Sequence, residues 1–211
     1  PHLPKVDLVL TDPPYGIGAS SKNFGKWRTS KMEKGNWDNE TPSVETLTLA
    51  ISNSNKSIVF GMNYFELKPT RNFIVWDKGA GFKGRDFAEC ELAWCSWDGN
   101  AKVFQRDPLA MRDYAEKAHP TQKPVALMKW CIAQAGDVKT ILDPFMGSGT
   151  TLLAARSMGA SCIGIEMDEK YCAIAVERLR QQSFSFEAPA SCDTADTSTP
   201  SYQDGLLALM M

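Results

Sequence analysis

Several features that mark other protein classes are missing from this chain of 211 residues. It has only two histidines, His2 and His119, and none of its six cysteines forms a Cys-x-x-Cys pair. Because zinc ligands usually come in such closely spaced sets, no metal site is expected. The cysteines are instead expected to be reduced and mostly buried thiols, as in a cytosolic protein.

Long apolar segments are missing as well. No run in the sequence approaches the roughly 18 apolar residues that a membrane-spanning helix requires. The first residues do not combine a basic segment, an apolar stretch and a small-residue cleavage site, so a secretory signal is not predicted. We therefore expect a cytoplasmic protein without a membrane partner.

An excess of basic charge is the third missing feature. The 23 Lys and Arg residues face 25 Asp and Glu residues, which gives a net charge of −2. Residues 183–211 hold four acids and no base, so residues 1–182 carry a net charge of +2. Any affinity for phosphate groups must therefore come from local basic patches. Residues 1–182 are expected to form one domain, and the Ser-, Thr-, Asp- and Pro-rich residues 183–211 a disordered acidic tail.

What is present is an alternation of short apolar runs with stretches of helical periodicity. Strands are predicted at about residues 6–11, 57–61, 72–76, 91–97, 139–142 and 161–165. Helices are predicted at about 42–51, with Thr41 as N-cap, and at about 125–135, 148–158 and 168–182. This order predicts an α/β fold, with a mostly parallel twisted sheet and helices on both faces.

A glycine-rich turn follows one of the predicted strands. Residues 143–151 read Asp-Pro-Phe-Met-Gly-Ser-Gly-Thr-Thr, in which Gly147 and Gly149 let the backbone turn closely beneath a ligand. Glu166 ends the next strand, where a carboxylate can accept hydrogen bonds from ribose hydroxyls. A lone Gly-x-Gly is more often a helix cap, but the combination predicts an adenosine-containing cofactor. NAD is disfavoured, because Leu152 stands where a Gly-x-Gly-x-x-Gly pattern needs its third glycine.

The first predicted strand ends in a second motif, Asp12-Pro13-Pro14-Tyr15. Two successive prolines remove two N–H donors and leave a stiff turn with free carbonyl acceptors. With the Asp12 carboxylate and the flat ring of Tyr15, such a turn can hold the exocyclic amine of a planar base. Hydrogen bonds from both N–H groups would pull the nitrogen toward tetrahedral geometry and expose its lone pair. Asp-Pro pairs more often begin ordinary turns. That interpretation is weaker here, because all four residues of the motif stand at the end of a predicted strand.

Taken together, the two motifs resemble those of DNA amino-methyltransferases that use S-adenosylmethionine, most of all the adenine-N6 enzymes of the beta class. In that class the catalytic Asp-Pro-Pro-Tyr precedes the cofactor loop, as residues 12–15 precede residues 143–150 here. The sequence His-Pro-Thr-Gln-Lys-Pro at 119–124 resembles the segment that helps to hold the methionine end of the cofactor. The resemblance covers roughly residues 6–180. It implies a Rossmann-like methyltransferase fold, either complete or short of one edge strand.

The resemblance implies a role for each matching residue. The catalytic residues would be Asp12, Pro13, Pro14 and Tyr15, and the cofactor site would be lined by Lys123, Asp143, Phe145, Gly147, Gly149, Thr150 and Glu166. His119 is a weaker candidate for binding, because a histidine before proline is more often a structural turn residue. The reaction would be a direct displacement onto N6 of adenine, with no metal and no covalent enzyme intermediate.

Two polar segments are candidates for contact with DNA. Residues 16–41 alternate basic and aromatic residues and predict a mobile lid, and residues 98–118 predict a small, irregular target-recognition insert. Phosphate contacts are predicted for Lys22, Lys26, Arg28, Arg106 and Arg112, and Phe24 or Trp27 could fill the gap left by an extruded base. For any single residue a solvated loop explains the pattern equally well. Double-stranded DNA is the expected partner, and a homodimer is left open.

Other acceptors fit the same chemistry: cytosine N4, an RNA base, or a protein amide. In the family, Ser-Pro-Pro is linked to cytosine and Asn-Pro-Pro to glutamine amides, so Asp12 favours adenine. A catalytically inactive DNA-binding homologue would keep the basic loops without the cavity. A restriction system, phage self-protection and gene regulation are all compatible with the sequence. Every catalytic interpretation requires that folding bring Asp12 and Gly147 to one cavity.

Overall fold

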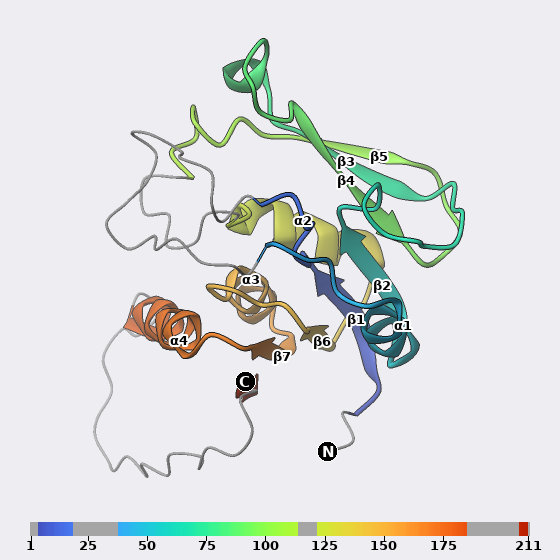
Figure 1. Cartoon of the computed structure of the whole chain (residues 1–211). Coiled ribbons are helices and arrows are strands. Elements are labelled where there is room, and N and C mark those ends of the chain that lie inside the picture. Colours follow the sequence, from blue (N-terminus) through green and yellow to red (C-terminus); the bar gives the residue numbers. More distant parts are fainter. Residues whose placement is uncertain (1–3, 19–37, 114–121, 185–206, 211) are drawn as a thin grey trace, which may run out of the picture.

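The computed structural model describes residues 4–18, 38–113, 122–184 and 207–210. Their elements, in chain order, are β1 (Val6–Thr11), α1 (Val44–Ser52), β2 (Ser54–Phe60), β3 (Phe73–Asp77), a 3-10 turn (Ala80–Phe82), β4 (Cys90–Cys95), β5 (Lys102–Gln105), α2 (Val125–Ala135), β6 (Thr140–Asp143), α3 (Thr150–Ser157), β7 (Ser161–Glu166), α4 (Glu169–Phe184) and β8 (Leu207–Met210). Figure 1 shows them as one sheet flanked by helices. None of the described helices is both long and apolar enough to cross a membrane.

The strands form one eight-stranded sheet in the order β5-β3-β4-β2-β1-β6-β7-β8. Four pairings are parallel: β1 with β2, β1 with β6, β6 with β7, and β3 with β5. Only β4 and β8 run against the other strands of the described sheet. The predicted α/β fold with a mostly parallel sheet is therefore confirmed.

Helices cover both faces of this sheet. On one face, α2 packs on β1, α3 on β6 and β7, and α4 on β7 and β8, and a continuous core there includes Leu10, Ile58, Leu127 and Leu152. On the other face, α1 contacts β2, and a smaller apolar cluster forms around Leu142. Burial on both faces explains why residues 8–10 of β1 are consecutive apolar residues rather than an alternating pattern.

The first helix begins two residues later than predicted. It starts at Val44, and its N-cap is Ser43 rather than Thr41. The hydroxyl of Ser43 accepts a hydrogen bond from the backbone N–H of Thr46 at 3.2 Å, the usual bond of an N-cap side chain. Both residues are favoured at N-caps, with serine slightly ahead of threonine, and here the chain path that enters the helix places Ser43 at the cap.

Strand β5 lies inside the segment predicted to be an irregular insert, and that prediction is wrong for residues 102–105. They pair in parallel with β3 along the sheet edge. Only Phe104 of this strand is partly buried, where its ring lies 5.3 Å from that of Trp130 on α2. With three of its four side chains exposed, the strand carries almost no apolar pattern.

The predicted disordered tail is wrong in the parts that the structure describes. Helix α4 continues to Phe184, and residues 207–210 form β8, which pairs antiparallel with β7 at the sheet edge. This strand forms one edge of the described sheet, beside β7. The intervening residues 185–206, and residues 19–37 of the predicted lid, lie outside the described residues.

Candidate active site

The two sequence motifs open onto one cavity of about 950 Å³. Asp12 and Tyr15 line it from the turn after β1, and Gly147 and Glu166 line it from the ends of β6 and β7. Strands β1 and β6 are parallel neighbours, so the segments that follow them leave the same edge of the sheet. The structure thus brings the motifs together, as every catalytic interpretation of the sequence requires.

The glycine turn has different uses for its two glycines. Gly147 and Gly149 both have positive φ, at 51° and 79°. Gly149 is the N-cap of α3, and a Cβ at this position would lie only 2.8 Å from the Cβ of Ala175 on α4. Gly147 lines the cavity, whereas Gly149 lies behind it against α4. The second glycine is therefore required by helix packing, and the first leaves space for a ligand.

Glu166 is fixed beside this turn by backbone donors. Its carboxylate accepts hydrogen bonds from the N–H groups of Gly147 at 3.0 Å, Met167 at 2.8 Å and Asp168 at 2.9 Å. Burial raises the pKa of Glu166, and these three hydrogen bonds oppose that rise. A carboxylate offers about four lone-pair sites, so this one retains capacity for a further donor from the cavity.

Asp143 braces the two central strands. Its Oδ1 accepts hydrogen bonds from the hydroxyl of Thr11 on β1 at 2.8 Å and from the N–H of Phe145 at 3.1 Å. The side chain is almost fully buried, and this burial raises the pKa of Asp143 to about 6. The folded chain therefore keeps a proton here over a pH range in which an unfolded chain has lost it.

The raised pKa of Asp143 predicts how a substitution at this position changes the thermal stability of the chain. Because the ordinary pKa is 3.8 and the folded value about 6, the contribution of Asp143 to the free energy of unfolding falls as pH rises through this window. Asp143→Asn keeps an acceptor oxygen without the charge, so we expect it to raise Tm at pH 8 by on the order of 5 °C. At pH 4 the variant and the wild-type chain should unfold at similar temperatures. Thermal unfolding at both pH values measures this, and a lower Tm for the variant at pH 8 would contradict it.

Arg178 on α4 supports the glycine turn from behind. Its guanidinium donates to the carbonyl of Ser148 at 2.5 Å, to the Ser148 hydroxyl at 3.0 Å and to the Thr150 hydroxyl at 3.3 Å. The Ser148 hydroxyl in turn donates to the side-chain oxygen of Gln122, at 3.1 Å, in the segment before α2. Burial lowers the pKa of Arg178 to about 10. Sequence reasoning missed this residue, because one arginine on an amphipathic helix carries no distinguishing pattern.

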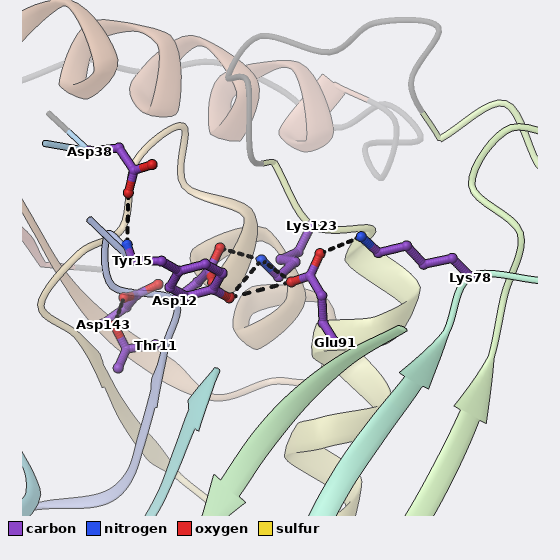
Figure 2. A network of polar contacts seen from close by, with 8 residues as sticks. All are labelled: Thr11, Asp12, Tyr15, Asp38, Lys78, Glu91, Lys123 and Asp143. Carbon is purple, nitrogen blue, oxygen red and sulfur yellow. Dashed lines mark hydrogen bonds and ion pairs between the residues drawn. The ribbon is translucent and has the colours of Figure 1, made fainter. Parts of the chain in front are cut away.

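The turn after β1 is held in one conformation by hydrogen bonds. The N–H groups of Tyr15 and Gly16 donate to Oδ1 of Asp38 at 2.7 and 3.1 Å. The Tyr15 hydroxyl donates to Oδ1 of Asp12 at 2.6 Å, and the Lys123 ammonium lies 2.5 Å from Oδ2 (Figure 2). Asp38 is buried, and it had no signal in the sequence because it follows a long polar stretch.

The ring of Tyr15 packs against two residues that sequence reasoning also missed. It stacks on Tyr64 with ring centroids 4.8 Å apart and planes 12° from parallel. A Cβ at Gly61 would overlap the Tyr15 ring, and Gly61 itself has a φ of 75°. Gly61 directly follows the buried end of β2, and this position was the one feature of the sequence that could have identified it.

A row of alternating charges continues from Asp12. Lys123 also contacts Oε2 of Glu91 on β4 at 2.8 Å, and Lys78, just after β3, contacts the other oxygen of Glu91 at 2.7 Å (Figure 2). The side chains are 4% exposed for Lys123, 9% for Lys78, 15% for Asp12 and 18% for Glu91. The order Lys78, Glu91, Lys123, Asp12 gives each buried charge a neighbour of opposite sign.

Burial and these neighbours shift the pKa of each group. Burial favours a protonated Glu91, but the charges of Lys123 and Lys78 outweigh it and hold the pKa of Glu91 at about 2. Burial opposes the charged form of Lys123 too, yet Asp12 and Glu91 raise its pKa overall. Burial raises the pKa of Asp12, and the negative charge of Glu91 acts in the same direction. Burial also raises the pKa of Tyr15 well above its usual range, so its hydroxyl remains a donor.

The predicted site residues are placed as follows. The cavity lining includes Asp12, Pro13, Pro14, Tyr15, Lys123, Asp143, Phe145, Gly147, Thr150 and Glu166. The Lys123 ammonium contacts Asp12 and Glu91, so its predicted contact with a cofactor stays a prediction. Within the described ranges, no group of three or more His, Cys, Asp or Glu side chains is arranged to hold a metal ion.

The residues predicted to contact DNA phosphates lie apart from this cavity or outside the described residues. The guanidinium of Arg106 forms two hydrogen bonds of 2.7 Å with Asp113, which a phosphate would have to displace. Arg112 is exposed and has a positive φ of 56°. Lys22, Lys26, Arg28 and His119 lie outside the described residues, as do the gap-filling candidates Phe24 and Trp27.

The chain is an α/β protein whose glycine turn and carboxylate-proline-aromatic turn open onto one cavity, an arrangement typical of folds that bind nucleotide-like ligands. Residues 89–177 match the family described as DNA methylase, whose name covers N6 and N4 methyltransferases. Type II methyltransferase M.HinfI of Haemophilus influenzae is 43% identical over 67 residues, a match that spans 31% of this chain and 19% of that protein. Type II methyltransferase M2.LlaDCHI of Lactococcus lactis subsp. cremoris is 22% identical, and the match covers 83% of this chain and 82% of that protein.

The crystal structure of the M1.HpyAVI–SAM complex has a similar fold, with a TM-score of 0.54 and 24% identity. That similarity covers 83% of this chain and 90% of the other. The family match covers residues 89–177, less than half of the chain, and it does not separate the N6 type from the N4 type.

Proposed function

We propose that this chain transfers a methyl group from S-adenosylmethionine to N6 of an adenine extruded from double-stranded DNA. The observation that carries the proposal is the shared cavity of about 950 Å³, lined both by the Asp12 turn and by the Gly147 turn. A volume of this size suits a cofactor and a base together. Two strand ends that meet at one cavity would hold the two reacting groups face to face.

The residues of the second motif fit the adenosine part of this cofactor. Gly147 has no side chain to obstruct the loop, and the carboxylate of Glu166 has a lone-pair site left for ribose hydroxyls. Leu142, Phe145 and Ile165 supply apolar wall for a purine ring. When bound, the cofactor supplies a methyl group on a positively charged sulfur.

The residues of the first motif would prepare the amine. The Asp12 carboxylate accepts one N–H of the amine and a proline carbonyl of the same turn accepts the other, so the nitrogen lone pair is directed at the methyl carbon. As the carbon–nitrogen bond forms, the carbon–sulfur bond breaks and its electron pair stays on sulfur. The extra proton on nitrogen then passes to Asp12 or to water. Holding the two groups in line accounts for much of the expected rate.

The choice of adenine N6 rests on Asp12. By the resemblance, Asp-Pro-Pro-Tyr favours adenine, whereas the family match covers N4 as well as N6 types. Cytosine N4 in DNA is therefore the second candidate acceptor. The phosphate contacts proposed for Arg106, Arg112 and the basic residues of the lid would position the duplex rather than select the base.

The deciding experiment labels the product. The chain is incubated with methyl-tritiated S-adenosylmethionine and duplex DNA of mixed sequence, and the nucleosides are then separated and identified by mass. Label in N6-methyladenine supports the proposal, and label in N4-methylcytosine moves the activity to the second candidate. DNA binding without any label would show an inactive DNA-binding homologue.

The hydrogen bonds of Arg178 predict a specific defect in cofactor binding. Arg178→Leu removes the donors to Ser148 and Thr150 while it keeps an apolar side chain on α4. Loss of about 1.5 kcal/mol of charge-assisted hydrogen bonding would raise the KM for the cofactor about tenfold, with a smaller change in kcat. Steady-state kinetics with varied cofactor measures both constants. Arg180→Leu, at an exposed position of the same helix, is the matched control, and equal KM values for the two variants would contradict the prediction.

A further inference from the structure

The charged row beside Tyr15 is built from parts of the chain that are far apart in sequence. Asp12 follows β1, Lys78 follows β3, Glu91 belongs to β4, and Lys123 precedes α2 (Figure 2). Only the first and last of these carry a role implied by the sequence motifs. Glu91 connects the other members, because both of its oxygens contact an ammonium group.

The contacts of Lys123 leave its ammonium without a spare donor. It lies 2.5 Å from Oδ2 of Asp12, 2.8 Å from Oε2 of Glu91 and 3.5 Å from the Tyr15 hydroxyl. An ammonium group has three N–H donors, and these three acceptors use all of them. Glu91 therefore decides on which side of the Asp12 carboxylate the Lys123 ammonium lies.

The same arrangement determines which lone pairs of Asp12 remain available. Oδ2 accepts from Lys123 and Oδ1 accepts from the Tyr15 hydroxyl, at 2.5 and 2.6 Å. Each carboxylate oxygen has two lone-pair sites, so one site on each remains for a donor that enters the cavity. The Tyr15 hydroxyl also lies 3.3 Å from Oε2 of Glu91, which holds it on the Lys123 side of the carboxylate.

We propose that Glu91 is a positioning residue for methyl transfer: it holds the Lys123 ammonium and the Tyr15 hydroxyl on one side of Asp12, leaves the free lone pairs for the target amine, and keeps Asp12 a strong acceptor through its own negative charge. This inference rests on the proposed function. Glu91 acts on the reaction through its neighbours and needs no contact with the base or the cofactor.

The charges around Asp12 predict how the pH dependence of methyl transfer changes when Glu91 loses its charge. The charged and titratable groups around Asp12 are Lys123 before α2, Glu91 on β4, Tyr15 in its own turn and Asp143 on β6, with Lys78 beyond Glu91. Glu91 raises the pKa of Asp12, whereas Lys123 lowers it. Without the charge of Glu91, the cations face Asp12 unopposed, so the carboxylate ionises at lower pH and accepts a hydrogen bond from the amine less strongly.

The test compares pH–rate profiles of methyl transfer for the wild-type chain and Glu91→Gln, which keeps the size of the side chain without its charge. We expect the acid limb of the variant to move to lower pH by roughly one unit and kcat to fall up to about 100-fold. The KM for the cofactor should change less than about twofold, because the glycine turn is untouched. Thermal unfolding of each variant verifies that it is folded under the assay conditions.

Two further variants separate charge from position. Glu91→Asp keeps the charge on a shorter side chain, so its acid limb should stay in place while kcat falls. Lys78→Met removes a cation and leaves the Glu91–Lys123 contact, so its acid limb should not move to lower pH. If Glu91→Gln does not fold, these two variants test the inference. It would be overturned if the acid limb of either variant moved to lower pH.

The outcomes are distinguishable from a failure of the proposed function. A folded Glu91→Gln with lower kcat and an unmoved acid limb would make Glu91 a structural residue and overturn only this inference. A wild-type chain that methylates no nucleoside at any pH would overturn the proposed function, and this inference with it.

Discussion

Asp12→Ala is expected to lower kcat for methyl transfer at least about 1000-fold while the affinity for the cofactor stays within a few-fold. In the proposed reaction the Asp12 carboxylate is the group that accepts a hydrogen bond from the amine as its lone pair becomes available. Alanine removes that acceptor at the reacting centre, whereas Gly147 and Glu166 form their own contacts on the other side of the cavity. Single-turnover rates and equilibrium binding of the cofactor measure the two effects separately.

The folded state should tolerate this change. Without Asp12, Lys123 keeps its contact with Glu91 at 2.8 Å, and the cost of burying the Asp12 carboxylate is removed. Asp12→Asn, which retains one acceptor oxygen, should show an intermediate rate. Asp98→Ala, in an exposed ion pair with Arg71, is a control that should leave the rate unchanged. Methylation by Asp12→Ala at a rate within tenfold of the wild-type would remove Asp12 from the mechanism.

Much of the sheet could be predicted because its central strands are buried on both faces. β1 contains the apolar residues 8–10 and β6 the apolar pair 141–142, and each strand is soon followed by a residue that does not continue it, Pro13 after β1 and Pro144 after β6. Parallel pairing then brings the two following turns to one edge. The shared cavity follows from these features without any knowledge of side-chain contacts.

The rest of the site could not be predicted because it depends on which strands become neighbours. Glu91 reaches Lys123 only because β4 runs antiparallel beside β2, and nothing in the order of strands and helices fixes that orientation. Gly61 shows the same limit, since its lack of a side chain matters only where the Tyr15 ring crosses it. Arg106 was predicted to bind phosphate from its charge alone, whereas its partner Asp113 lies seven residues further along the chain.

Edge strands illustrate a different limit. β5 has three exposed side chains out of four, so its pairing with β3 depends on backbone hydrogen bonds more than on an apolar face. The four residues of β8 are apolar, which favours a strand. The sequence before them is rich in Ser and Thr, and this composition led to the prediction of a disordered tail. Composition averaged over a long segment hides a strand of this length.

Lys123→Met is expected to cause the largest loss of stability among single substitutions in the charged row. The side chain is 4% exposed and its ammonium contacts Asp12 and Glu91. Without it, Glu91 keeps Lys78 at 2.7 Å, but Asp12 is left as a buried carboxylate without a cation. Removing one partner of a buried pair typically costs about 3–5 kcal/mol, on the order of 10 °C in Tm for a chain of this size.

The pH dependence of this loss tests its cause. Asp12 without Lys123 would have a folded-state pKa raised further above its unfolded value, because Lys123 lowers that pKa in the wild-type chain. The folded variant then binds a proton that the unfolded chain releases, so its stability rises as pH falls toward and below that pKa. Denaturant unfolding at pH 8 and pH 5.5 should therefore show a smaller deficit at the lower pH. Lys139→Met, in a pair with Asp137 whose side chains are 73% and 84% exposed, is the control and should leave stability nearly unchanged at both pH values. A deficit of equal size at the two pH values would mean that the loss arises from packing of the lysine side chain and not from the uncompensated charge of Asp12.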